Sequence, residues 1–206
     1  MVRSLLPAIA AFVFMVALGP FASSASAQSS LPVRPFSVKW ADAQPAISFS
    51  ALSLGDSNVR KELRSGLRKR LVVTTQSYLE RNQKLIETRT FSCSVTYDLW
   101  EDGFVVERGR SRVRVRSVQE VLDRCLKVSG LLAGRAEKFA AHRGETVFFA
   151  VRAEFNPISQ TQCRNLVRSG QSSDSIGPVV INIVRRQICE ADSAIEFRSE
   201  PVQVPK

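Results

Sequence analysis

Residues 91–116, FSCSVTYDLWEDGFVVERGRSRVRVR, hold the strongest pattern in the chain and decide its fold class. From Phe91 to Leu99 the odd-numbered positions are apolar and the even-numbered positions are polar. This period of two predicts a strand with one buried face. Glu101-Asp102-Gly103 is a turn signal, and a second strand is expected from Phe104 to Arg116. The segment therefore predicts a long antiparallel hairpin.

The register of this hairpin depends on which side chains it would bury. A two-residue Asp-Gly loop pairs Val95 with Arg110 and turns a row of arginines toward the core. A three-residue loop, with Gly103 in the left-handed conformation, pairs Val95 with Gly109. We expect the second register, because it directs the valines inward and the arginines outward.

The segments on either side supply further strands and short helices. Upstream, we expect a strand at 47–54, a helix that opens at Gly55-Asp56-Ser57 and stops at Gly66, and a strand at 71–79. Downstream, Ser117 and Glu120 form a capping box that starts a helix. The remaining expected elements are a short helix at 136–140, a strand at 145–155, a helix opening at Ser159, a polar loop at 169–177, a strand at 179–184 and a final strand at 195–204 that Pro201 places at an edge or bulge.

These elements predict an α+β fold, a mostly antiparallel β-sheet with two to three short packed helices. An immunoglobulin-like β-sandwich is the alternative, and the capped helix at Ser117 counts against it. Residues 1–27 have the layout of a secretory signal peptide, with Arg3, an apolar run and a small-x-small site at Ala25-Ser26-Ala27. We expect a flexible lead-in at 28–44 and a single globular domain at 45–206. No transmembrane segment is expected in the processed chain, which should be exported, periplasmic or extracellular, and soluble.

The chain is strongly basic, with a formal net charge of +10. Outside the cytoplasm nucleic acid is not an expected partner. Anionic lipid head groups, polyanionic glycans or an acidic envelope protein are the candidates, and the alternative is that the charge serves solubility alone.

The four cysteines, an even number in an exported chain, predict two disulfides. Three connectivities are possible, and buried free thiols are the alternative. The expected inward faces favour the pairs Cys93–Cys125 and Cys163–Cys189. Their spacings do not match a metal site and the chain has one histidine, so we expect neither a metal nor a cofactor.

Catalytic motifs are absent from the sequence, and no catalytic residue is assigned. His142 is interpreted as a residue at a helix end, and Glu101 and Asp102 as turn residues. Trp100 has two interpretations, an exposed contact residue or, as we expect, a cover for the end of the core.

One unusual group of residues is a candidate anion-binding site. Arginine occupies every second position of the expected second strand, and one strand face would then present all five side chains as a ladder. We favour the alternative, a solvated face whose arginines pair with nearby glutamates. The ladder consists of Arg108, Arg110, Arg112, Arg114 and Arg116.

The order of these elements resembles an exported bacterial family, domain of unknown function 4390. The resemblance rests on five stretches: KELRSGLRKRLVVT, VTYDLWEDGFVV, SVQEVLDRCLKVSGL, RGETVFFAVRAEFNPIS and IEFRSEPV. Together they cover roughly residues 45–200, although the four cysteines are not a hallmark of that family. The resemblance implies a non-lipidated, non-enzymatic domain of the cell envelope. We therefore expect a binding or assembly domain. The alternatives are an unfamiliar type of hydrolase and a peripheral binder of anionic lipid or glycan through the arginine-rich strand face.

Overall fold

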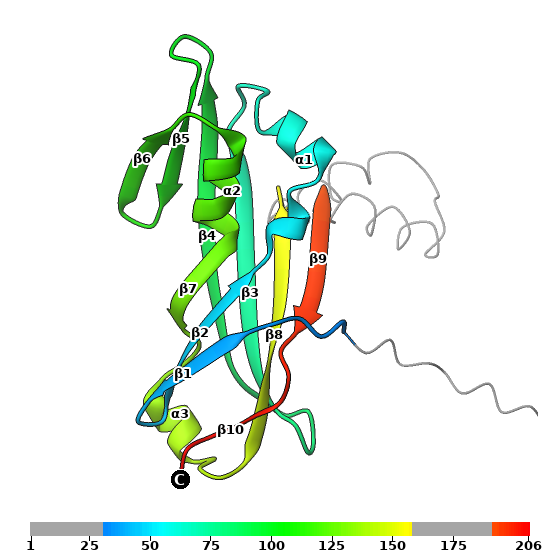
Figure 1. Cartoon of the computed structure of the whole chain (residues 1–206), viewed down its shortest axis with the longest axis vertical. Helices are drawn as coiled ribbons and strands as arrows, with labels where there is room; N and C mark the ends of the chain where they lie inside the picture. Colours follow the sequence, from blue (N-terminus) through cyan, green and yellow to red (C-terminus); the bar gives the residue numbers. More distant parts are fainter. Residues whose placement is uncertain (1–30, 158–190) are drawn as a thin grey trace, which may run out of the picture. The chain divides into compact units, whose positions relative to one another are not determined.

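The computed structural model describes residues 31–157 and 191–206, which belong to a compact unit beginning at Leu31. Figure 1 shows that this unit is built mainly of strands, with short helices beside them. The predicted α+β class, a mostly antiparallel sheet with short packed helices, is confirmed. The expected helix at Ser159, the polar loop at 169–177 and the strand at 179–184 lie outside the described residues.

The larger sheet has seven strands, all paired antiparallel. Its order is β10-β8-β3-β4-β5-β6, and β9 also pairs with β8. The long central strands are β3 and β4, which pair over nearly their whole length. The strands are β3 (Lys69–Leu79), β4 (Leu85–Asp98), β5 (Gly103–Arg108), β6 (Ser111–Val115), β8 (Thr146–Phe155), β9 (Ser193–Arg198) and β10 (Val202–Gln203).

A second, three-stranded sheet lies on one face of the larger sheet (Figure 1). Its strands are β1 (Ser37–Ala41), β2 (Gln44–Ser50) and β7 (Lys127–Leu132). The expectation of a flexible lead-in up to residue 44 is therefore wrong for its second half. Residues 37–41 pair with β2, because Val38 and Trp40 rest against the core and stabilise the strand. The globular unit starts earlier than predicted.

Three short α-helices and one 3-10 turn, η1 (Leu52–Leu54), complete the described part of the chain. The helices are α1 (Ser57–Glu62), α2 (Val118–Leu126) and α3 (Ala136–Ala140). Asp56 caps α1 and Ser117 caps α2, each by accepting a backbone N–H three residues on, as the sequence predicts. None of the helices in the described ranges is long and apolar enough to cross a membrane.

The core lies between the inner face of the larger sheet and the elements that cover it. The small sheet contributes Ile47 and Phe49 from β2, and α2 contributes Leu122. Phe149 and Phe155 of β8 are fully buried opposite them. Burial of these apolar side chains stabilises the two-layer arrangement.

The hairpin at 91–116 differs from its predicted register. Asp98 pairs with Gly103 and Val95 pairs with Val106, so the loop holds four residues, 99–102. The left-handed residue of this loop is Asp102, at φ 45°, rather than Gly103. A longer loop keeps Val95 and Val106 buried together, and this burial determines the register.

The predicted second strand is also interrupted. The chain turns at Gly109 and Arg110, and Arg108 pairs with Ser111. Gly109 has φ 59°, the conformation that a two-residue turn of type II′ requires at its first central position. Residues 104–116 therefore form two short strands, β5 and β6, instead of one long strand.

The expected final strand is divided in the same way, into β9 and β10. Ser199 lies between them and is almost fully buried. Its hydroxyl accepts the Phe149 N–H at 3.0 Å and donates to the Glu200 carbonyl at 2.7 Å. The break next to Pro201 agrees with the edge or bulge expected from that proline.

Candidate functional site

The turn at Gly109 rearranges the predicted arginine ladder. Arg108 ends β5 on the same face as the buried Val106, whereas Arg112 and Arg114 lie on the outer face of β6. Arg110 is in the turn between the two strands. The prediction that all five arginines share one strand face is therefore wrong, because it assumed a single continuous strand.

Three of these arginines have partners within the domain. Arg108 stacks over the Phe91 ring, at 4.5 Å from guanidinium carbon to ring centroid, and donates to the Arg124 carbonyl at 3.2 Å. Arg112 lies 3.6 Å from Glu107, and Arg114 pairs with Glu101. Among the described residues, Arg110 and Arg116 form no ion pair. The paired arginines agree with a solvated, partly neutralised face rather than with an open anion ladder.

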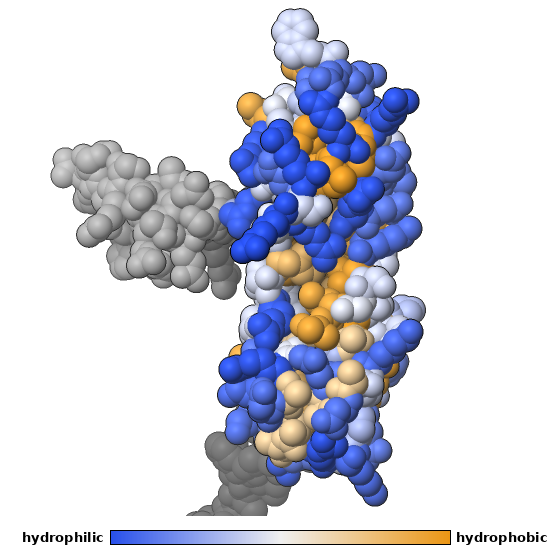
Figure 2. Space-filling view, turned by 90° about the vertical axis from the view of Figure 1, so that its left-hand side faces the viewer, coloured by the Kyte–Doolittle hydropathy of each residue, from blue (hydrophilic) through white to orange (hydrophobic). Residues whose placement is uncertain are grey.

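Figure 2 shows this side of the domain as mainly hydrophilic surface broken by apolar patches. Glu107 accounts for part of the neutralisation, because it also forms a 2.7 Å ion pair with Arg68, the residue before β3. Arg114 has a second carboxylate, Asp98, at 3.9 Å. Exposed ion pairs of this kind contribute little free energy individually.

The end of the domain formed by the β4–β5 loop has a different character. Trp100 is 97% exposed and Leu99 is 71% exposed, so the loop places two large apolar side chains in solvent. Leu67, in the turn between α1 and β3, is 66% exposed. A Cβ at Gly66 would lie 3.4 Å from the Leu99 Cδ1, which places the two turns against each other. The expectation that Trp100 covers the end of the core is wrong.

Two exposed arginines lie in segments that adjoin these turns. Arg116 follows β6, next to Val115, whose carbonyl oxygen would lie 3.5 Å from a Cβ at Gly103. Arg64 lies in the turn after α1, close enough to Tyr97 to influence the pKa of its hydroxyl. Both arginines are exposed, and neither forms an ion pair with another described residue. We call the surface formed by Leu67, Leu99, Trp100, Arg64 and Arg116 the apex surface.

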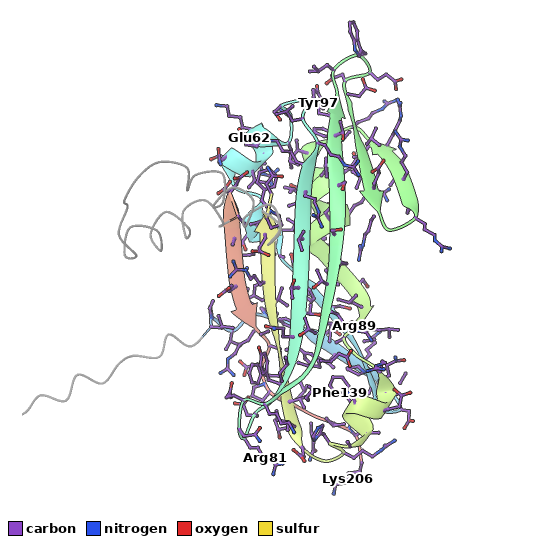
Figure 3. The ribbon with its side chains drawn as sticks, turned by 180° about the vertical axis from the view of Figure 1, so that it is seen from behind. Glu62, Arg81, Arg89, Tyr97, Phe139 and Lys206 are labelled. Atoms are coloured by element: carbon purple, nitrogen blue, oxygen red, sulfur yellow. A yellow bond between two sulfur atoms is a disulfide. The ribbon has the colours of Figure 1, made fainter. Side chains whose placement is uncertain are left out.

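Hydrogen bonds hold the apex loop in one conformation. The Asp98 carboxylate accepts the N–H groups of Trp100 at 3.1 Å and of Glu101 at 3.3 Å. The Tyr97 hydroxyl donates to Asp102, and this hydrogen bond, assisted by burial, raises the pKa of Tyr97 above its ordinary value. Figure 3 labels Tyr97 at this end of the domain, where Glu62 of α1 is also labelled. The carboxylates of the loop are therefore occupied by contacts within the domain.

A cysteine pair joins the sheet to α2 below this end. Cys93 of β4 and Cys125 of α2 are both buried and lie at disulfide distance, with 5.7 Å between their Cα atoms. This is the first of the two predicted pairs. Cys163 and Cys189 lie outside the described residues.

The residues considered for chemistry remain apart. His142 follows α3; its backbone N–H donates to the Phe139 carbonyl at 2.8 Å and its ring Nδ1 lies 3.5 Å from Glu145. This is the helix-end position predicted for it. Within residues 31–157 and 191–206, His, Cys, Asp and Glu side chains do not gather in a group of three that could hold a metal ion.

A shallow hollow of about 360 Å³ lies between the two ends of the described chain, lined by residues 33–36, Val38, Ser199, Glu200 and Val202. Its one cationic side chain, Arg34, donates to Ser53 at 2.6 Å and stacks over Phe197. The hollow therefore offers apolar surface without a converging set of polar groups.

Comparison of the chain with protein-family models, with curated proteins and with solved structures finds no match.

Proposed function

We propose that this chain is an exported, non-catalytic binding domain of the cell envelope that contacts its partner through the apex surface. The observation that carries the proposal is the exposure of Trp100, Leu99 and Leu67 together at one end of the domain. Large apolar side chains placed side by side in water are characteristic of interaction sites. Leu99 and Trp100 lie in the β4–β5 loop, and Leu67 lies in the turn between α1 and β3. The folded domain brings these two turns together.

The envelope location has independent support from the sequence. Residues 1–27 have the layout of a signal peptide, and the cysteine pair at disulfide distance suits an oxidising compartment. The resemblance of residues 45–200 to the exported family described above points to the same location. We therefore place the domain outside the cytoplasm, in the periplasm or beyond.

The apex surface supports this function better than the arginine row does. Arg112 and Arg114 have carboxylates beside them, and the negative charge of these carboxylates offsets the attraction of the two arginines for an anion. Arg64 and Arg116 form no ion pair among the described residues, and both lie in segments at this end of the domain. The apex surface would therefore bind a partner that carries negative charge and also offers apolar surface.

Sedimentation of the protein with washed envelope fragments tests the proposal. The double variant Leu99→Ser with Trp100→Ser is expected to lower the sedimented fraction several-fold, because it removes most of the exposed apolar area of the apex surface.

Leu85→Ser is the matched control. Leu85 is 46% exposed and lies at the opposite end of β4, about 45 Å from Leu99 at the usual rise of a strand. This variant should sediment like the wild-type protein. Equal sedimentation of the wild-type protein and the apex double variant would show that the apex surface is not the contact.

A further inference from the structure

We infer that the partner of the apex surface is an anionic lipid bilayer, with Trp100, Leu99 and Leu67 entering the head-group region and Arg64 and Arg116 binding lipid phosphates. This inference rests on the proposed function and names its partner. It concerns the loop end of the domain, away from the arginine row of β5 and β6.

The shape and size of the surface favour a bilayer over a folded protein. The apolar side chains belong to loops at one end of the larger sheet (Figure 1), and Trp100 is almost completely exposed. Three such side chains offer on the order of a few hundred Å², less than the roughly 800 Å² that one partner contributes to a standard protein interface. A small projecting group suits insertion between lipid head groups, where tryptophan is favoured.

The backbone of the loop is prepared for a medium with little water. Transfer of an unpaired N–H from water to an apolar medium is costly, so a loop that enters a bilayer needs its donors satisfied. Asp98 already accepts the N–H groups of Trp100 and Glu101. These two N–H groups are therefore already hydrogen bonded before the loop enters the interface.

Two exposed arginines at this end of the domain can bind lipid phosphates, and the formal net charge of the chain is +10. Glu101 pairs with Arg114, whereas Asp102 keeps its negative charge and accepts a hydrogen bond from the Tyr97 hydroxyl. Arg64 and Arg116 form no ion pair with another described residue, and arginine binds phosphate oxygens through two N–H groups at once. Attraction of a basic side chain to an anionic leaflet adds to the apolar contribution.

Co-sedimentation with vesicles tests the inference. The protein is used as it is recovered from cells, after any processing of its N-terminus. The vesicles are phosphatidylcholine alone, or phosphatidylcholine in which about a third of the lipid is phosphatidylglycerol. We expect binding to the second kind, falling steeply as salt is raised. Leu99→Ser with Trp100→Ser should weaken binding at least about tenfold, and Leu85→Ser should leave it unchanged.

A second pair of variants separates local charge from net charge. Arg64→Gln with Arg116→Gln should weaken binding about tenfold to thirtyfold, since each arginine near the surface contributes roughly a factor of five. Arg110→Gln with Lys84→Gln removes the same net charge from exposed positions away from the apex and should have little effect.

The outcomes are distinguishable from those of the envelope experiment. One outcome is that the wild-type protein does not bind anionic vesicles but needs Trp100 to sediment with envelope fragments. This result would overturn the lipid assignment and leave the proposed function standing, with a protein or glycan as the partner. Equal weakening by both charge variants would also overturn it, because net charge alone would then explain binding.

Discussion

Gly109 is the residue whose backbone conformation divides the arginine-rich segment. Its φ of 59° is accessible to glycine at no steric cost, and a Cβ there would have no atom within 4 Å. The constraint at this position is therefore conformational and not one of space. Two turn residues, one of them this glycine, convert an alternating strand pattern into a hairpin.

Replacement of Gly109 by valine tests the turn directly. A β-branched residue in the left-handed region is strained, so Gly109→Val should destabilise the domain by about 1–2 kcal/mol in denaturant unfolding. If residues 104–116 formed one straight strand, valine would be neutral or stabilising.

Gly103→Ala is the control for this variant. Gly103 does not have a positive φ, and its Cβ would lie at ordinary contact distance from Val115 and Glu101. Its effect should be small beside that of Gly109→Val, and comparable losses from the two variants would contradict the assigned turn.

At the scale of elements, the helices and the central strands could be predicted because each has a local signal. The caps at Asp56 and Ser117 mark where α1 and α2 begin, β-branched residues mark β3, and alternation marks β4 and β8. The strand β7 has no such signal. It follows α2 without a turn, contains Gly130 at φ 62°, and exists because β2 pairs with it.

The sequence left two interpretations of Trp100 open, and it could not decide between them. The exposure of Trp100 depends on the register of the β4–β5 hairpin, which makes the loop four residues long and carries the side chain past the end of the sheet. The register depends in turn on burial of Val106 against α2 and the rest of the core. The composition of the loop, with its acidic residues and glycine, indicated a turn but not its length.

The cysteine pair joins two elements that otherwise contact each other only through packing. It closes a loop with a sequence separation of 32 residues. Replacing Cys93 and Cys125 with alanine should lower the free energy of unfolding by about 3–4 kcal/mol in the chain-entropy model. Denaturant unfolding measures this loss, and non-reducing peptide mapping of the wild-type protein identifies the pairs. Four free thiols, or Cys93 joined to a cysteine other than Cys125, would contradict the assignment.

An ion pair fixes α1 to β3 and so supports the turn that carries Leu67. Lys69 Nζ donates to Glu62 Oε2 at 2.7 Å, and the lysine side chain is only 10% exposed. The hydrogen bond from Lys69, reinforced by its positive charge, lowers the pKa of Glu62 below its ordinary value of 4.5. Because the folded-state pKa is the lower one, the stabilisation is present at neutral pH and is lost as the pH falls through that folded-state value.

Glu62→Gln should therefore lower the Tm by a few degrees at neutral pH, with the difference from the wild-type protein shrinking below pH 4.5. Thermal unfolding across this pH range measures the effect. Glu137→Gln removes an exposed carboxylate that forms no ion pair among the described residues, and it serves as the control. A Tm difference for Glu62→Gln that persists unchanged into acid would contradict the assigned role.

At the scale of the whole molecule, the proposed export would determine which surfaces the domain can meet. The small-x-small site at Ala25-Ser26-Ala27 predicts a mature chain that begins at Gln28 and is recovered from the exported fraction. N-terminal sequencing of the accumulated protein checks both statements. A cytoplasmic protein that retains residues 1–27 would contradict the envelope location and remove the reason to expect envelope lipid as the partner.

The chain contains two tryptophans, so contact between the apex surface and a bilayer can be measured by tryptophan fluorescence. Trp40 is partly buried and packs edge-on against Phe139, with 5.8 Å between ring centroids. The conservative change Trp40→Phe leaves Trp100, at the apex, as the single tryptophan of the protein. Its fluorescence then reports the surroundings of one side chain.

The decisive measurement is the emission of Trp100 in the Trp40→Phe protein on vesicles containing phosphatidylglycerol and spin-labelled lipid. We predict a shift to shorter wavelength on binding, with stronger quenching by a label near the head groups than by one deep in the acyl chains. The shift should disappear at high salt, when the protein leaves the vesicle. Emission that stays at the wavelength of a water-exposed tryptophan, without quenching, while the protein co-sediments with vesicles, would contradict contact through the apex surface.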